Sequence, residues 1–224
     1  MRSPRTTREQ EAYAKVVYPG TDVYVNKLGI RDQTTLDQVE RDLSALRAEQ
    51  AFPRSAHHRT YTGFKAIHRH LFQDLYIWAG MERRYTTGRG PAPFAVPEHI
   101  GLWMLQQFAE LAHQGYLVGL NRDDFATAAA RYVNEINAAH PFIDGNGRTQ
   151  RFWLRMLADN AGFELTLSDA DRKAWNDASR QGFTASNHAP MAALLKKRLK
   201  PKHDSPSPLP ARPARPRKKR RPST

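Results

Sequence analysis

The sequence predicts an all-α domain of seven or eight helices with one short β-hairpin. Three observations support this fold class. Apolar residues recur at spacings of three and four along residues 1–200, which is the period of an amphipathic helix. Turn residues between two short extended runs occur at one place, residues 81–96. Residues 201–224 hold seven of the fifteen prolines and no aromatic residue, so we expect a disordered tail after a single domain.

Two helices are predicted in the first fifty residues. The first covers about 6–17, with Thr7 as its cap, and ends at a Tyr-Pro-Gly-Thr break. The second starts at Thr34 or Thr35 and reaches about Glu49. Its apolar residues follow one another at intervals of three, four and three, so we expect them in the core: Leu36, Val39, Leu43 and Leu46.

The third helix is predicted over residues 63–78, directly before the hairpin. One apolar stripe defines it: Phe64, Ile67, Leu71, Leu75 and Trp78. His68 and His70 lie two residues apart and therefore on different faces, which makes them a poor metal pair. We expect packing or solvent roles for both. In the hairpin, Pro91 and Pro93 favour an edge strand.

Five further helices complete the predicted domain. Pro97 suits the first position of one helix, Asn121 and Asp124 have the spacing of a cap and its acid, and Gly162 is placed to stop another. The expected positions are 97–113, 121–140, 146–160, a helix capped by Ser168 with Asp171, and 187–199.

The segment His-Pro-Phe-Ile-Asp-Gly-Asn-Gly-Arg-Thr-Gln-Arg, from His140 to Arg151, carries the clearest chemistry. Pro141 interrupts one helix, and the apolar pattern resumes so that a new helix begins near Asn146. A glycine-bracketed turn at a helix start leaves backbone N–H groups at the positive end of the helix dipole, which is an anion site. Arg148 and Arg151 lie three apart and can reach one side of that site.

Two further side chains in this segment point to a reaction. Asp144 is a hard oxygen ligand suited to the Mg²⁺ that accompanies a nucleoside triphosphate. His140 can take a proton near neutral pH. The combination predicts phosphoryl or nucleotidyl transfer. The alternative is an ordinary helix–loop–helix corner, which has no use for two in-phase arginines beside an acid and a histidine.

The same twelve residues match the signature of the Fic family, His-Pro-Phe-x-Asp/Glu-Gly-Asn-Gly-Arg-x-x-Arg, at every defined position. Residues 68–80 also resemble the helix that precedes the hairpin of Fic proteins, called the flap. The resemblance implies a Fic-type helical bundle, with a Fic domain over residues 1–200 and its core at about 60–160. It also implies transfer of a nucleoside monophosphate, usually AMP from ATP, to a Ser, Thr or Tyr hydroxyl of a target protein.

Roles for single residues follow from the resemblance. His140 is expected to be the general base, and Asp144 the ligand of a Mg²⁺ that bridges the α- and β-phosphates. Arg148 and Arg151 are expected to clamp the β- and γ-phosphates. The anion hole is expected from Gly145, Asn146 and Gly147, with Asn146 at the α-phosphate. The flap is expected to hold a target segment by strand addition through Tyr85, Thr86, Thr87, Gly88 and Phe94.

Regulation and target are implied in the same way. Many Fic proteins carry an inhibitory helix with the pattern Ser/Thr-x-x-x-Glu-Gly/Asn, and none of the nine glutamates in this chain is followed by Gly or Asn. We therefore expect a bacterial toxin held inactive by a separate small antitoxin that supplies this helix. Type II topoisomerase ATPase subunits, of gyrase or topoisomerase IV, are candidate targets. The alternatives are an exported effector that modifies a host protein and a Fic protein that transfers another phosphate-containing moiety.

The net charge of +13 is concentrated at the C-terminal end. Residues 196–224 hold twelve Lys and Arg against one acid, which leaves 23 basic and 21 acidic residues before them. The run 217–221 could bind nucleic acid or another polyanion, or serve as a delivery signal, and a solvated tail is the alternative. The absence of cysteine excludes disulfides, and residues 1–7 lack the apolar segment of a signal peptide. We expect a cytoplasmic protein without membrane spans, with export to another cell as the alternative.

Overall fold

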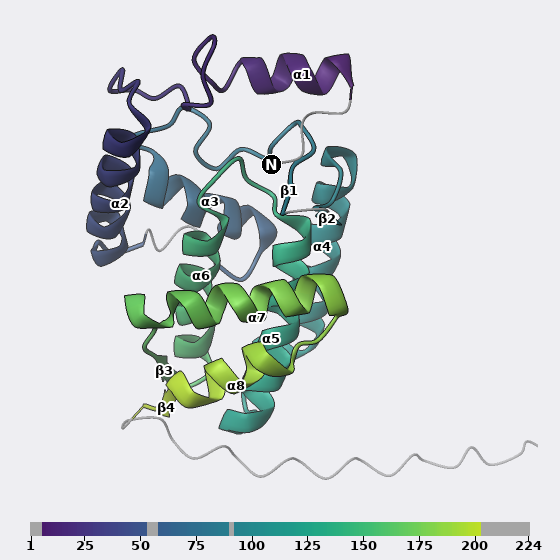
Figure 1. Ribbon diagram of the computed structural model, residues 1–224. Coiled ribbons are helices and arrows are strands. Elements are labelled where there is room, and N and C mark those ends of the chain that lie inside the picture. The colour runs from purple at the N-terminus through teal and green to yellow at the C-terminus, as the bar shows by residue number, and fades with distance from the viewer. Residues whose placement is uncertain (1–5, 53–57, 90–91, 203–224) are drawn as a thin grey trace, which may run out of the picture.

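The computed structural model describes residues 6–52, 58–89 and 92–202. Within these residues eight α-helices form the fold, which confirms the predicted all-α class (Figure 1). Two short 3₁₀ turns, η1 and η2, precede α5 and α7. In chain order the helical elements are α1 Thr7–Ala14, α2 Gln33–Glu49, α3 Tyr61–Phe72, α4 Pro97–His113, η1 Gly115–Leu117, α5 Arg122–Ala139, α6 Asn146–Asn160, η2 Asp169–Asp171, α7 Arg172–Ala185 and α8 Ala189–Arg198.

Two pairs of short antiparallel strands join the helices. The pair β1 Gly88–Arg89 and β2 Ala92–Pro93 is the predicted hairpin. The pair β3 Phe163–Leu165 and β4 Leu199–Pro201 is a correction, because the sequence predicts one hairpin and assigns Pro201 to the tail. Each of these strands has three residues and the two are distant in sequence, so the alternation of Phe163, Glu164 and Leu165 is too short to mark a strand.

Helix α5 is the centre of the bundle. It packs against α4, α6, α7 and α8, and α7 crosses in front of α6 in Figure 1. Its inward side chains are fully buried: Phe125, Ala129, Val133 and Ile136. Because α5 and α6 are both held in this core, the loop that joins them has two fixed ends.

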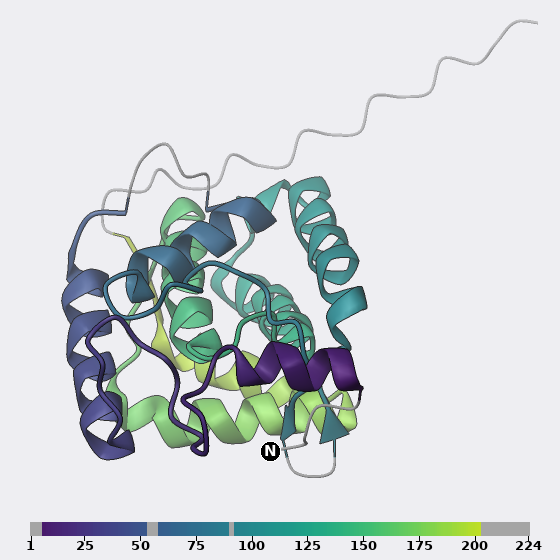
Figure 2. The same ribbon diagram turned by 90° about the horizontal axis from the view of Figure 1, so that it is seen from above.

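The N-terminal helix α1 lies across the flap, as the view from above shows (Figure 2). It is capped by Thr6, not by Thr7 as the sequence predicts, in a capping box with Glu9. Helix α2 is likewise capped earlier than predicted, two or three residues before Thr34 or Thr35, by Asp32, whose side chain accepts the Thr35 N–H at 2.8 Å. In both cases the acceptor oxygen belongs to the last residue with extended backbone, as capping geometry requires.

The apolar stripes are confirmed with two differences. Every predicted stripe residue of the third helix is buried, but α3 ends at Phe72 and not at residue 78, so Leu75 and Trp78 lie in the turns that follow the helix. On α2, Leu36 is buried but Leu46 is 55% exposed. Ten residues at about 100° each turn Leu46 roughly 80° away from Leu36. The buried face of α2 instead runs along Leu36, Glu40 and Ser44.

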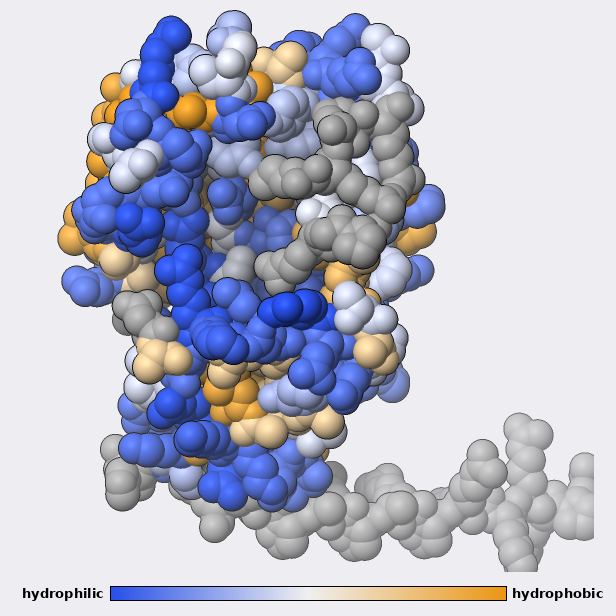
Figure 3. Space-filling model, viewed as in Figure 1, coloured by the Kyte–Doolittle hydropathy of each residue, from blue (hydrophilic) through white to orange (hydrophobic). Residues whose placement is uncertain are grey.

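The described surface is mainly polar on the face drawn in Figure 3, with scattered apolar patches. No helix in the described ranges is both long and apolar enough to span a bilayer. The predicted tail and its basic run, apart from Pro201 and Lys202, lie outside the residues that the structure describes.

Candidate active site

The predicted site lies where α5 ends and α6 begins. His140 is the C-cap residue of α5, with a left-handed backbone (φ 45°, ψ 62°), and its N–H donates to the Ile136 carbonyl at 3.0 Å. This conformation turns the chain out of the helix ahead of Pro141. The imidazole lies parallel to the ring of Phe94 in the flap, with 3.9 Å between the ring centroids and 1° between the planes. The flap therefore supports one face of the expected base.

The side chain of Asn146 closes the loop on itself. Its amide oxygen accepts the Phe142 N–H at 3.0 Å, and its amide nitrogen donates to the Phe142 carbonyl at 2.9 Å. Asn146 is buried, and both ends of its side-chain amide are used within the loop. A phosphate would therefore be bound by backbone N–H groups and not by this side chain. Helix α6 begins at Asn146, as predicted, and no side chain caps it. Its first N–H groups are thus available to an anion.

Gly145 is required at the turn before α6. Its φ of +75° is a left-handed value, and a Cβ added there would lie 2.4 Å from the ring of Phe72. Both the backbone conformation and the space therefore exclude a larger residue. Glycine at this position lets the loop pack directly against the ring of Phe72.

His68 of α3 holds the loop from the core side. The Gly80 N–H donates to His68 Nδ1 at 2.8 Å, so Nδ1 carries no proton and Nε2–H donates to the Asp144 carbonyl at 2.9 Å. The ring is stacked on Phe142, with 3.9 Å between centroids. Burial lowers the pKa of His68 to about 3, which keeps the ring neutral. The predicted packing role of His68 is confirmed, and the residue also forms two hydrogen bonds that the sequence did not predict.

Asp144 carries the carboxylate expected to bind Mg²⁺. The residue is exposed at the surface of the loop, and its own carboxylate accepts the Gly145 N–H. Desolvation and the negative charge of Glu40 raise the pKa of Asp144, against the opposing effects of Gly145 and Arg148. A carboxylate beside a second acid is an environment that a cation stabilises.

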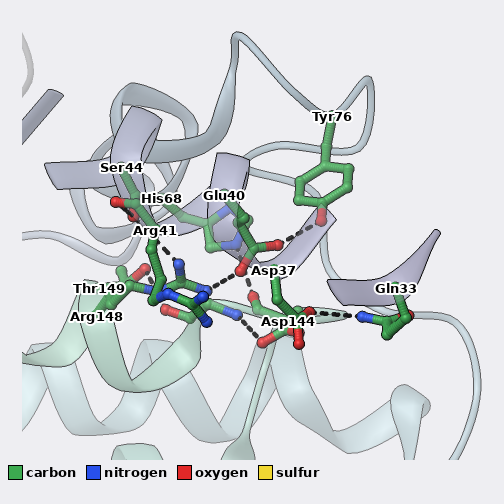
Figure 4. A network of polar contacts seen from close by, with 11 residues as sticks. Gln33, Asp37, Glu40, Arg41, Ser44, His68, Tyr76, Asp144, Arg148 and Thr149 are labelled. Carbon is green, nitrogen blue, oxygen red and sulfur yellow. Dashed lines mark hydrogen bonds and ion pairs between the residues drawn. The ribbon is translucent and has the colours of Figure 1, made fainter. Parts of the chain in front are cut away.

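The two signature arginines stand against different helices. Arg148 Nη2 forms an ion pair with Glu40 of α2, and Nη1 donates to Ser44 Oγ at 3.1 Å (Figure 4). Its guanidinium lies over the ring of Phe72, 4.6 Å from the centroid. Arg151 lies on the other side, 5.8 Å from the ring centroid of Trp175 in α7. Both start from the first turns of α6, so they flank the helix start rather than lie together.

Arg83 is a site residue that sequence reasoning missed. It is buried before the flap, and its guanidinium donates to the carbonyl groups of both flap arms and of the end of α5. The acceptors belong to Tyr85, Ala95, Ala139 and His140. Burial lowers the pKa of Arg83 to about 10, so it stays charged at neutral pH. In the sequence, Arg83 and Arg84 stand side by side, and nothing in the pattern indicates that one of them is buried.

The predicted flap residues are brought to the site, with mostly buried side chains. Phe94 covers His140, and Tyr85 packs edge-on against Tyr13 of α1, with ring centroids 5.2 Å apart. The Thr86 N–H donates to the Glu9 carboxylate of α1 at 2.8 Å. The side chain of Thr87 is also buried, whereas Gly88 is half-buried in β1. Strand addition to this flap therefore depends on its backbone edge and not on these side chains.

A groove adjoins the flap rather than the start of α6. It has a volume of about 1270 Å³ and lies between α1 and the segment that leads into the flap. Ile143 of the signature reaches it, and two of its lining residues, Ile77 and Met81, are exposed apolar side chains. The residues expected to bind phosphate, 145–148 and 151, do not line it.

The fold and the site define a class of protein: a helical nucleotide-transferring enzyme with an imidazole beside an open helix start. Residues 59–158 match the model of the Fic/DOC family. The probable protein adenylyltransferase y4lH of Sinorhizobium fredii is 40% identical over 183 residues, 81% of this chain and 94% of that protein. The protein adenylyltransferase VbhT of Bartonella schoenbuchensis is 33% identical over 182 residues, 81% of this chain and 38% of that protein.

A solved structure agrees with the sequence relatives. The BepC protein of Bartonella tribocorum, a VirB-translocated effector crystallised with bound AMPPNP, has a TM-score of 0.78 and 25% identity, covering 88% of this chain and 100% of that one. The chain therefore belongs to the Fic/DOC family, and it is a protein adenylyltransferase of the nucleotidyltransferase class.

Proposed function

We propose that this chain transfers AMP from ATP to a Ser, Thr or Tyr hydroxyl of a target protein, with His140 as the general base. The observation that carries this proposal is the position of His140. A left-handed cap and the parallel ring of Phe94 fix the imidazole directly before the uncapped start of α6. A proton acceptor and an anion site are thus one short loop apart.

The reaction in this site is an in-line displacement at the α-phosphorus. The target hydroxyl oxygen forms a bond to the α-phosphorus, its proton passes to the His140 imidazole, and the bond from the α-phosphorus to the α,β-bridging oxygen breaks. Pyrophosphate leaves with the electron pair of that bond. The backbone N–H groups of Asn146 and Gly147, together with Arg148 and Arg151, stabilise the charge that builds on the phosphate oxygens. The Gly145 N–H donates to the Asp144 carboxylate in this structure and joins them only when it leaves that acceptor.

Asp144 is the residue that would hold Mg²⁺. Its carboxylate is the hard oxygen donor that Mg²⁺ prefers, it is exposed at the loop, and the neighbouring Glu40 carboxylate makes a nearby cation favourable. Bound there with the nucleotide, Mg²⁺ supplies neutralisation of phosphate charge. One protein carboxylate with the remaining positions from phosphate and water is an ordinary arrangement for this ion.

The target is held by the flap in this proposal. A target segment would add to the backbone edge of β1, near Gly88, and so present its hydroxyl towards His140. Arg83 supports this arrangement because its guanidinium joins both flap arms to the end of α5. The candidate targets are gyrase and topoisomerase IV ATPase subunits, as the resemblance implies.

A separate antitoxin is the proposed regulator of this activity. The chain holds no glutamate followed by Gly or Asn, so the inhibitory pattern Ser/Thr-x-x-x-Glu-Gly/Asn would come from another protein. We place this toxin activity in the bacterial cytoplasm. The second candidate context is export into another cell as an effector, which is supported by the similarity to the VirB-translocated BepC protein.

The proposal is tested with variants that separate chemistry from binding. His140→Ala is expected to abolish transfer of AMP to protein in a lysate while Mg-ATP still binds, because the imidazole contacts no phosphate in this mechanism. Expression of the wild-type chain alone is expected to inhibit growth, and expression of His140→Ala is not. Unchanged AMP transfer by His140→Ala would overturn the assignment of the base, and harmless wild-type expression would overturn the toxin context.

A further inference from the structure

Helix α2 reaches the signature from outside the matched part of the chain. The family model covers residues 59–158, and α2 ends at Glu49. Its buried ridge carries Glu40 and Ser44, which are polar residues at positions where a surface helix usually has apolar ones. Both side chains contact Arg148, as Figure 4 shows.

The contacts around Arg148 fix its guanidinium on three sides. Glu40 accepts from Nη2, Ser44 accepts from Nη1, and the ring of Phe72 lies beneath the plane at 4.6 Å. The second carboxylate oxygen of Glu40 accepts from the Tyr76 hydroxyl, so both of its oxygens are engaged. Glu40 is only 8% exposed. An arginine gripped in this way has lost most of its rotamer freedom before any ligand binds.

Arg148 keeps donors for a ligand despite these contacts. A guanidinium has five N–H groups, and the contacts with described residues occupy two of them. The remaining three can bind phosphate oxygens while Glu40 and Ser44 stay in place. The ion pair therefore does not compete with a phosphate for the same N–H group.

Helix α2 is itself attached to α3, and to the turn that follows α3, by polar contacts one turn beyond Ser44. Arg47 forms a bidentate ion pair with Asp74, with both N–O distances at 2.6 Å. The Arg47 carbonyl also accepts from His70 Nε2 at 2.8 Å. Bidentate arginine–carboxylate contacts set geometry as well as energy. The position of Glu40 relative to α6 is thus determined by the fold and not by a mobile side chain.

From this geometry we propose that Glu40 and Ser44 are positioning residues that orient Arg148 towards the β- and γ-phosphates, so that α2 is part of the nucleotide site. This inference rests on the proposed function, because it assigns Arg148 to the triphosphate. It identifies a specificity element: the grip on Arg148 favours nucleotides that carry β- and γ-phosphates over a monophosphate.

The test is the affinity of the full-length chain for Mg-ATP and for AMP, measured by calorimetry. Glu40→Ala removes the orienting acceptor and is expected to weaken Mg-ATP binding about 10- to 100-fold, the usual effect of losing a charged hydrogen bond. AMP affinity is expected to stay within about twofold, since a monophosphate has no β- or γ-phosphate for Arg148 to hold. Ser44→Ala is expected to show the same selectivity with a smaller loss.

Asp42→Asn is the matched control. Asp42 is exposed on the same helix and contacts Gln38, so this variant removes one negative charge from α2 without touching Arg148. Its Mg-ATP affinity is expected to equal that of the wild type. Glu40→Gln keeps the size of the side chain and serves where Glu40→Ala does not fold. It is expected to lose less affinity than Glu40→Ala.

A double-mutant cycle with Arg148→Ala decides the mechanism. If Glu40 acts through Arg148, adding Glu40→Ala to Arg148→Ala produces no further loss of Mg-ATP affinity. A further loss in the double variant, an equal loss for AMP, or tighter Mg-ATP binding by Glu40→Ala would each overturn the inference. Failure of the proposed function gives a different result, in which Arg148→Ala itself leaves Mg-ATP binding unchanged.

Discussion

Replacing His68 by leucine tests how the loop that carries Asp144 is held. The substitution removes the acceptor for the Gly80 N–H and the donor for the Asp144 carbonyl. His68 itself is fully buried, whereas Gly80 is half-buried and Asp144 is exposed. A buried polar group without a partner costs about 1–3 kcal/mol. Because Gly80 is only half-buried and Asp144 is exposed, water can replace part of each hydrogen bond, and the two together predict a loss of about 1–3 kcal/mol in the free energy of unfolding, before any loss of stacking on Phe142.

The assay is equilibrium unfolding in urea, with the slope compared between variants to verify that the same surface is exposed. His113→Leu is the matched control because His113 is exposed in the last turn of α4, and it is expected to change the free energy by less than about 0.5 kcal/mol. His68→Gln can restore one of the two hydrogen bonds and is expected to be intermediate. A loss below about 1 kcal/mol for His68→Leu would refute the account of the loop.

Three further predictions concern the loop, the flap and the fold. Gly145→Ala places a Cβ against Phe72 at a left-handed φ, so calorimetry should show Mg-ATP affinity reduced by about tenfold or more. Glu9→Gln weakens the contact of α1 with Thr86, so KM for a protein target should rise about threefold or more while ATP affinity stays unchanged; the reverse pattern would contradict it. The hydrogen bond from the Ser168 N–H, followed by those from Arg198 and the Ser168 hydroxyl, lowers the pKa of Asp171 in the folded chain. The ionised carboxylate therefore stabilises the fold at any pH above its unfolded pKa near 4. This stabilisation is lost as pH falls through the lowered pKa. Thermal melts should therefore show Asp171→Asn less stable than wild type at pH 7, with the difference shrinking at pH 3.

The helices and the signature loop were accessible to sequence reasoning because their determinants are local. The spacing of Phe125, Ala129, Tyr132 and Ile136 is sufficient to predict α5. The pair Asn121 and Asp124 marks its start, and the structure confirms Asn121 as the cap. The glycine-bracketed turn is likewise sufficient to place the start of α6 at Asn146.

The supports of the site were not accessible, because their contacts join positions far apart in sequence. Glu40 meets Arg148 only when α2 lies on α3, and Arg83 meets the end of α5 only when the flap folds back. The one local signal was an acid among the apolar positions of α2. Glu40 lies four residues after Leu36, which places it close to the apolar face. A charged residue so close to a predicted core stripe predicts a buried carboxylate, and a buried carboxylate requires a partner of opposite charge.

The central claim is that the α-phosphate, and not the γ-phosphate, is transferred to protein. The most direct measurement is to incubate the chain with a bacterial lysate and ATP labelled at either the α- or the γ-phosphorus, with His140→Ala as the control. The account predicts protein labelled from the α-position, no label from the γ-position, and none from either with His140→Ala. Protein labelled from the γ-position by the wild type alone would contradict it and indicate a kinase.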